Sequence, residues 1–404
     1  MLVERYQKAD RSMRLSIPGL CFLTSSIQLK FDTDGYTTLF EPTTGHYFDP
    51  GKILVLTNLH IQMFSLRSVN GVSFFDTIMI PGDFKIPEIY DGTQNLGGRS
   101  ILILMLNGWG DMILIQPALR AFYEKAISSG DPPRITLGCN WIGNFPYPGV
   151  PYIQDVRPNI LTLKELIKFD LLINLIPINH QRSLHKSMKV LCLEILKLNG
   201  KDQEIAAPSV VPDSKRIARI QPILKQIRKE TGKKLLCVNW KSRFLHKNAS
   251  PVLFSKIISK LGDRYQALVF KDIETSKVMQ KEIEDLKAPI MNISYLIHDY
   301  HDTIAALSLV DAFISVDTGI VHAAGAMGIP GVALFGPFPP ETHVADYASV
   351  IGIRAQYEGK ACKGPCLETH RGCAEVKFSS TKVSPCFKAI RDDDVIEALE
   401  KLGN

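Results

Sequence analysis

The sequence predicts an α/β protein built from two Rossmann-like domains with a β-rich N-terminal extension. Apolar strand-like runs alternate with helical runs over residues 96–205 and again over residues 206–404. This alternation is typical of a parallel sheet that helices cover on both faces. Residues 1–95 instead contain short alternating runs and the turn-forming pairs Asp34-Gly35 and Asn70-Gly71, which favour hairpins.

The N-terminal extension, residues 1–95, contains no obvious catalytic constellation. A β-rich appendage of this kind could offer a strand edge to a neighbouring subunit or a partner. It could equally be an extension that packs on the adjacent domain. Both interpretations remain open from the sequence.

The first Rossmann-like domain is expected over residues 96–205. It opens with the apolar run SILILML, a glycine loop and an amphipathic helical run, which together form a βα unit. The runs RITLGCN and DLLINLIP predict further strands, and the runs LTLKELIKF and MKVLCLEILKLNG predict helices.

The second Rossmann-like domain is expected over residues 206–404. It begins with the polar, Pro- and Ser-containing run AAPSVVPDSKR, a linker candidate. Strands are predicted at KLLCVNW, ALVFKDI, APIMNIS, AFISVD and GVALFG, and a final helix at DDDVIEALEKLGN. Two such halves joined by one linker are expected to form a cleft, a common place for ligands.

Bulk properties exclude several classes of protein. The 404 residues suit two or three domains, and the 45% apolar and 22% charged fractions are ordinary for a globular chain. A formal charge of +6 suits an anionic ligand but is too weak to predict nucleic-acid binding. The sequence contains no run of about 18 apolar residues, so no membrane span is predicted. The N-terminus is a poor signal peptide. We therefore expect a cytoplasmic protein.

The most informative segment runs from Phe313 to Tyr347. A buried strand ends in Asp317-Thr318-Gly319, a helix rich in small residues follows, and a second strand ends in Gly336-Pro337. Free N–H groups at a helix start favour an anion, typically a phosphate, and a glycine there lets the backbone approach it. His322, one turn into the helix, could face the same ligand or could be an ordinary packing residue.

A second polar loop, Asn107-Gly108-Trp109-Gly110-Asp111, ends the first strand of the first domain. Ligands of open α/β sheets bind at this carboxyl end of the strands. Asp111 could act there as a general base, or it could simply cap the helix. The loop is not a GxGxxG fingerprint, so nicotinamide-cofactor binding is a weak hypothesis.

A basic loop, residues 238–248, follows another apolar strand. Lys241, Arg243 and Lys247 could offset the charge of a diphosphate leaving group without a divalent metal. The alternative is a solvated basic loop with no ligand.

Eight cysteines divide into two groups. Cys21, Cys139, Cys192 and Cys237 are scattered and resemble buried free thiols. The other four are Cys362, Cys366, Cys373 and Cys386, with the spacing C-x3-C-x6-C-x12-C. In a chain without a secretion signal, such a cluster favours a metal over disulfides. Four thiolates suit a structural tetrahedral site, and iron and zinc cannot be distinguished by the spacing.

Taken together, these motifs resemble the ADP-heptose glycosyltransferase (heptosyltransferase) family. Gly110-Asp111 followed by Pro117-Ala118-Leu119-Arg120 is similar to the family's first motif, and Ser315 to Pro337 matches its SVDTGxxHxAxAxGxPxVALFGP pattern at nearly every position. The extension and the four cysteines resemble the bacterial autotransporter heptosyltransferase branch. The resemblance covers residues 99–404.

The resemblance implies a GT-B type fold, with an acceptor-side domain at 96–205 and a nucleotide-sugar-binding domain at 206–404. It implies an inverting enzyme that moves heptose from ADP-D-glycero-β-D-manno-heptose to serine hydroxyls of an autotransporter passenger domain, with Asp111 as the base. It also implies one structural iron per subunit on the four clustered cysteines and a ring-shaped dodecamer. The expected donor-binding residues are Asn107, Gly108, Trp109, Gly110, Lys241, Arg243, Lys247, Asp317, Thr318, Gly319, His322, Gly336 and Pro337.

Two other functions remain open from the sequence. One is heptose transfer to a lipopolysaccharide core sugar. The other is a non-catalytic nucleotide-sugar or metal-binding assembly protein.

Overall fold

The computed structural model describes residues 87–403, apart from 106–107, 129, 140–144, 158–160, 163–164, 166–167, 176–177, 179–184, 199–204, 243, 271–272, 286–287, 355, 363, 368–372, 374 and 376–382. Before residue 87 it describes only nine short strands. Within these residues, no helix combines the length and the apolar character needed to cross a bilayer.

The described strands of the N-terminal region pair antiparallel: β1 with β9, β2 with β6, β3 with β4 and β5, and β7 with β8. Val69 in β7 faces Val72 in β8, on either side of the predicted Asn70-Gly71 turn. Asp34-Gly35 lies outside the described residues. The strands are β1 (Tyr6–Lys8), β2 (Leu20–Phe22), β3 (Ile27–Phe31), β4 (Thr38–Leu39), β5 (His46–Phe48), β6 (Lys52–Val55), β7 (Ser68–Val69), β8 (Val72–Ser73) and β9 (Met79–Pro81).

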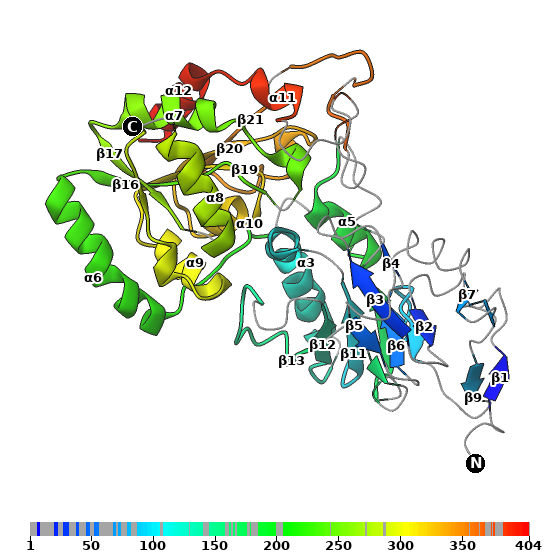
Figure 1. Cartoon of the computed structure of the whole chain (residues 1–404). Coiled ribbons are helices and arrows are strands. Elements are labelled where there is room, and N and C mark those ends of the chain that lie inside the picture. The colour runs from blue at the N-terminus through cyan, green and yellow to red at the C-terminus, as the bar shows by residue number, and fades with distance from the viewer. Residues whose placement is uncertain are drawn as a thin grey trace.

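The first Rossmann-like half contains a parallel five-stranded sheet with the strand order β10-β15-β11-β12-β13. Its strands are β10 (Glu88–Ile89), β11 (Ser100–Leu104), β12 (Arg134–Gly138), β13 (Asp155–Arg157) and β15 (Leu171–Asn174). Helices α3 (Trp109–Ile127) and α5 (Met188–Ile195) pack on each other beside the sheet (Figure 1).

The second half contains a parallel six-stranded sheet with the strand order β18-β17-β16-β19-β20-β21. Its strands are β16 (Lys234–Asn239), β17 (Tyr265–Val269), β18 (Ile290–Asn292), β19 (Ala312–Val316), β20 (Gly331–Leu334) and β21 (Val350–Ile353). Its helices are α6 (Ser214–Thr231), α7 (Pro251–Leu261), α8 (Ile273–Glu284), α9 (Tyr300–Leu307), α10 (Gly319–Ala326), α11 (Pro385–Lys388) and α12 (Asp392–Gly403), with 3₁₀ turns η4 (Leu245–Lys247), η5 (Ser294–Leu296) and η6 (Pro340–Thr342).

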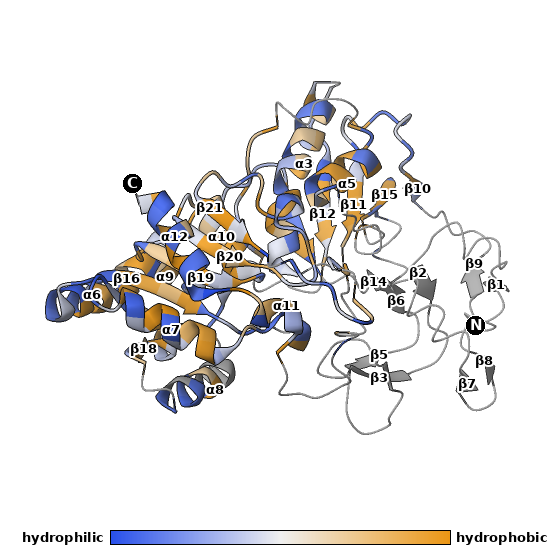
Figure 2. Cartoon of the chain, turned by 90° about the horizontal axis from the view of Figure 1, so that it is seen from above, coloured by the Kyte–Doolittle hydropathy of each residue, from blue (hydrophilic) through white to orange (hydrophobic). Residues whose placement is uncertain are grey.

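Helices cover both faces of the second sheet, because successive side chains of a strand point to opposite faces. In β16, Leu235 and Cys237 join the core formed with α6, α9 and α10, whereas Leu236 and Val238 join the core formed with α7 and α12. Figure 2 shows strands of this sheet as largely hydrophobic and α6, at the edge of the domain, as largely hydrophilic. An α/β protein with two parallel sheets was predicted, and this prediction is confirmed.

The two halves share one continuous core. Apolar residues of α3 and α5 belong to the same buried cluster as those of α9 and α10, and α3 lies directly against α10 (Figure 1). The carboxyl ends of β11 and β19 therefore face each other across this helix contact.

Two details differ from the sequence interpretation. LTLKELIKF was predicted to be helical, but Leu161–Thr162 form strand β14, which pairs antiparallel with β6. The strand takes only the first two residues of this run, where the backbone pairs with β6, and Glu165 further along is helical. Strand β10 lies inside the predicted extension but pairs with β15 in the first parallel sheet.

Candidate functional site

The start of α10 is held by polar contacts from the neighbouring strand. Strand β19 ends at Val316, Thr318 is the N-cap of α10, and Gly319 is its first residue. The side-chain amide of Asn239, at the end of β16, donates to Thr318 Oγ1 at 3.3 Å and to Ser315 Oγ at 3.0 Å. Thr318 makes no capping hydrogen bond with its own side chain, so the first-turn amides of α10 keep their positive potential.

Asp317 is the centre of a buried charged cluster. Its side chain is 4% exposed, and Lys247 Nζ donates to its Oδ2 at 2.7 Å. His322 Nε2 lies 3.8 Å from the other carboxylate oxygen, and the Tyr347 hydroxyl lies 3.5 Å from His322 Nδ1. The cluster joins the basic loop, the helix α10 and the segment after η6.

The carboxylate of Asp317 is ionised despite its burial. Burial by itself raises the pKa of this group, but the Lys247 ammonium, together with the nearby His322 ring, outweighs it and holds the pKa well below its usual range. The negative charge of Asp317 therefore fixes the position of the Lys247 ammonium beside the start of α10.

The start of α3 meets the start of α10. Gly108 is the N-cap of α3, and Asp111 lies in the first turn. A Cβ atom at Gly110 would collide with the His322 ring, so glycine is required for this close approach. The alternative role of Asp111 as the N-cap is wrong, because Gly108 occupies that position.

Trp109 covers the backbone of Gly319. A Cβ atom at Gly319 would lie 2.9 Å from Trp109 Cε3. The Trp109 ring also contacts the ring of Tyr300, whose hydroxyl donates to the Gly319 carbonyl at 3.4 Å. The sequence predicted an open backbone at Gly319, but here the absence of a side chain makes room for an indole from the other half.

The α10 region is also where the chain matches a known protein family. Residues 298–370, which include α10 and the Asp317 loop, match the family model of glycosyltransferase family 9 (heptosyltransferase). The chain has the GT-B fold. The match agrees with the expected resemblance to heptosyltransferases. No match was found among curated protein sequences.

The solved structures that are similar to the chain include the following three. A family 9 glycosyl transferase from Veillonella parvula has 18% identity and a TM-score of 0.57, with 76% of this chain and 98% of that chain covered. ADP-heptose LPS heptosyltransferase II of E. coli has 12% identity and a TM-score of 0.53, with 75% and 98% covered. The iron-containing dodecameric glycosyltransferase TibC of enterotoxigenic E. coli has 13% identity and a TM-score of 0.50, with 96% and 91% covered. At these identities the matches show the fold alone.

The basic loop divides into two environments. Lys247, in η4, points inward to Asp317 and is 10% exposed, so the solvated-loop alternative is wrong for this residue. Lys241 forms an ion pair with Glu282 of α8. Arg243 and, in the other loop, Asn107 lie outside the described residues.

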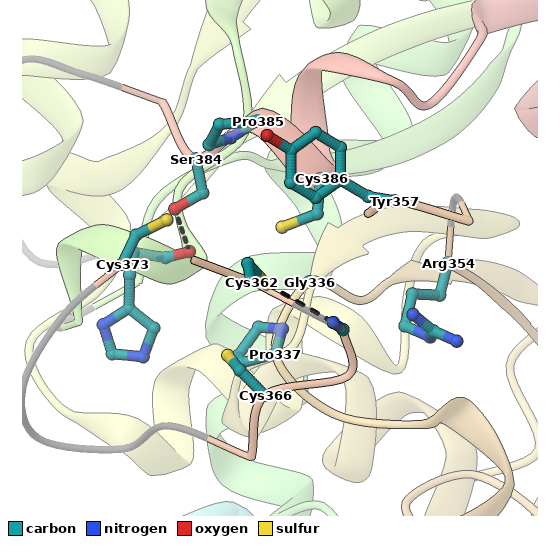
Figure 3. A pocket seen from close by; sticks show the side chains of 12 residues that line it. Gly336, Pro337, Arg354, Tyr357, Cys362, Cys366, Cys373, Ser384, Pro385 and Cys386 are labelled. Atoms are coloured by element: carbon teal, nitrogen blue, oxygen red, sulfur yellow. Dashed lines mark hydrogen bonds between the residues drawn. The ribbon is translucent and has the colours of Figure 1, made fainter. Parts of the chain in front are cut away.

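The four clustered cysteines line one cavity. The cavity has a volume of about 20 Å³, and His246, Gly336 and Pro337 also line it. Figure 3 shows the four cysteine side chains with Gly336 and Pro337. The described residues contain no group of three His, Cys, Asp or Glu side chains close enough to hold a metal ion. Burial and the nearby Cys373 raise the pKa of Cys386 to about 12, so this thiol is protonated at neutral pH.

Several residues of the site carried no motif in the sequence. Tyr300, at the start of α9, reaches the Gly319 carbonyl, and Tyr347 reaches His322 further along α10; only the fold shows these two contacts. Asn239 could have been found, because it is the polar residue that ends an apolar strand at the carboxyl edge of the sheet. Gly336 and Pro337 lie at the cysteine cavity, on the loop after β20.

Proposed function

We propose that the chain is an inverting glycosyltransferase that moves heptose from ADP-D-glycero-β-D-manno-heptose to an acceptor hydroxyl. The observation that carries the proposal is the contact between the starts of α3 and α10. It brings the first turn of α3, which contains Asp111, against the first turn of α10. Transfer of a sugar from a nucleotide diphosphate needs a base for the acceptor hydroxyl and an anion-binding site for the diphosphate. The two halves of the chain would each supply one of these.

In this proposal the donor diphosphate binds the N–H groups at Thr318 and Gly319. Lys247 supplies the balancing cation, because its ammonium already lies at the α10 start, whereas Lys241 is paired with Glu282. Asp317 accepts hydrogen bonds from sugar hydroxyls. Binding requires the Trp109 indole to move away from Gly319, so the two halves separate slightly when the donor enters.

The transfer step then follows from these positions. Asp111 takes the proton of the acceptor hydroxyl as its oxygen bonds to the anomeric carbon. The bond from that carbon to the diphosphate breaks on the opposite face through an oxocarbenium-like state, and ADP leaves with the electron pair. The helix start and Lys247 offset the leaving-group charge.

We propose a serine of an autotransporter passenger domain as the acceptor. The similarity to TibC extends over 96% of this chain and so includes N-terminal strands. The similarity to the LPS heptosyltransferase II of E. coli extends over only 75% of this chain. These strands are a feature that supports an acceptor other than a lipopolysaccharide core sugar. By the same likeness we propose a ring-shaped dodecamer.

We further propose that Cys362, Cys366, Cys373 and Cys386 hold one structural iron, with zinc as the alternative. The fit is supported by four sulfur donors around one cavity, which is large enough for an ion or a water molecule. The thiols must lose their protons and draw together to bind it. A bound metal would fix this segment against the loop after β20.

The test is Asp111→Ala in a transfer assay with ADP-heptose and a passenger domain, read by mass spectrometry. We expect transfer to fall by at least about a hundredfold, with ADP affinity measured by calorimetry within about threefold of wild type. Asp393→Ala is the matched control, since Asp393 lies in the first turn of α12. Near-normal transfer by Asp111→Ala would refute the base.

The acceptor and the activity itself are tested separately. Modification of core oligosaccharide but not of the passenger would favour the lipopolysaccharide alternative. Absence of ADP release with either acceptor would favour a non-catalytic assembly protein.

A further inference from the structure

Two segments of the second half face both the cysteine cavity and the charged cluster. His246 and Pro337 line the cavity, and their next neighbours, Lys247 and Phe338, lie on the side of Asp317. Lys247 Nζ is 4.7 Å from the centre of the Phe338 ring. A shift of either segment at the cavity would therefore move the residues that position the ammonium.

The cysteine segment is hydrogen-bonded to both of these segments. Ser384 Oγ donates to the His246 carbonyl oxygen at 3.0 Å, and the Leu367 amide donates to the Pro337 carbonyl oxygen at 2.9 Å. Ser384 is 2% exposed and lies two residues before Cys386 (Figure 3). A buried hydroxyl on the carbonyl of a three-residue turn restrains that turn directly.

We propose that Ser384 is a positioning residue for the donor site. By holding the His246 carbonyl it keeps η4 in the conformation that directs Lys247 onto Asp317, and it thereby couples the cysteine segment to the cation that balances the donor diphosphate. This inference deepens the proposed function and rests on it for the role of the diphosphate. The position of Lys247 itself can be measured without any ligand.

The physical reason is the length of the lysine side chain. Lys247 has four rotatable side-chain bonds, and its ammonium stays at Asp317 only while the backbone of η4 is fixed. Within η4, the Lys247 amide donates to the Phe244 carbonyl oxygen at 2.9 Å. A turn this short needs an external anchor, and Ser384 provides one from a distant part of the chain.

The first experiment is lysine footprinting of the full chain by reductive methylation and peptide mass spectrometry. Ser384→Ala should raise the modification rate of Lys247 about fivefold, the change that one lost hydrogen bond supports. Ser384→Thr keeps the hydroxyl and should restore protection. Lys189 is the internal control, because it is also buried, with 8% of its side chain exposed, and paired with Asp346.

Equal protection of Lys247 in wild type and Ser384→Ala would overturn the proposal. Increased reactivity of Lys189 as well would also overturn it, since the substitution would then open the whole fold rather than one turn. Protection that returns in Ser384→Thr supports it.

The second experiment measures ADP affinity by calorimetry. Ser384→Ala should weaken ADP binding about fivefold, and it should have no further effect in a Lys247→Met background, because both changes act through the same ammonium. Additive losses would overturn the coupling. A wild-type chain that binds no ADP would overturn the proposed function, while the footprint still decides the position of Lys247.

Discussion

Replacing Lys247 by Met should strongly destabilise the fold. The substitution replaces the side chain by an unbranched one that is a single atom shorter and carries no charge, so Asp317 would be left buried without its cation. Removing one partner of a buried ion pair costs about 3–5 kcal/mol. Because both side chains are at most 10% exposed, we expect the full effect, measured as the free energy of unfolding in urea at neutral pH.

Lys241→Met is the matched control from the same loop. Lys241 also pairs with a carboxylate, but the side chains of Lys241 and Glu282 are 19% and 28% exposed. Partly solvated pairs contribute about 0–1 kcal/mol. A Lys247→Met protein no less stable than Lys241→Met would refute the assignment of a buried, energetically coupled pair.

The difference in stability between wild type and Lys247→Met should change with pH in a defined direction. In wild type the pKa of Asp317 is lowered, so its stabilising contribution is present above the unfolded-state value of about 3.9 and is lost only as the pH falls through the folded-state pKa. In Lys247→Met the pKa of Asp317 should rise, because burial raises it and the ammonium that lowers it in wild type has been removed. The stability gap between the two proteins should therefore narrow as the pH is lowered from about 7 toward 4.

Two further predictions concern the contact between the halves and the cysteines. Gly319→Ala should lower the melting temperature, because the new Cβ atom would lie 2.9 Å from the Trp109 ring. Gly108→Ala should change the melting temperature little, because nothing lies within 4 Å of a Cβ atom there. Equal effects of the two substitutions would contradict the packing role of Gly319. Cys366→Ser should lower metal content, measured by elemental analysis, and metal uptake by the wild-type chain should strengthen as the pH rises, since the pKa of Cys386 is raised to about 12 and binding must release its proton. Full metal content in Cys366→Ser would count against a four-thiolate site.

The central strands could be predicted from the sequence because they are buried on both faces. Strands such as β11, β16 and β19 consist almost entirely of buried residues, and such continuous apolar runs stand out from their surroundings. The edge strands β10 and β13 did not stand out. They have two and three residues, and neither contains a fully buried side chain.

The loops of the site were predicted better than their contacts. Asp317, Thr318 and Gly319 follow a recognisable strand, and Gly110-Asp111 follows another. The choice between Lys241 and Lys247 could not be made from the sequence, because both are lysines in one basic loop. Only the η4 turn, which directs Lys247 inward, separates them. The indole over Gly319 was also unpredictable, since it comes from a residue about 200 positions away.

Backbone pairing ties the N-terminal strands and the first parallel sheet together in both directions along the chain. Glu88–Ile89 cover the edge of β15, and Leu161–Thr162 cross over to pair with β6. A shortened protein that began at Arg99 would uncover one strand edge and leave the other strand without its partner, and such edges invite association between molecules. A chimaera that exchanges one half of this chain for that of a protein with the same fold would therefore have to carry everything before the linker as one unit.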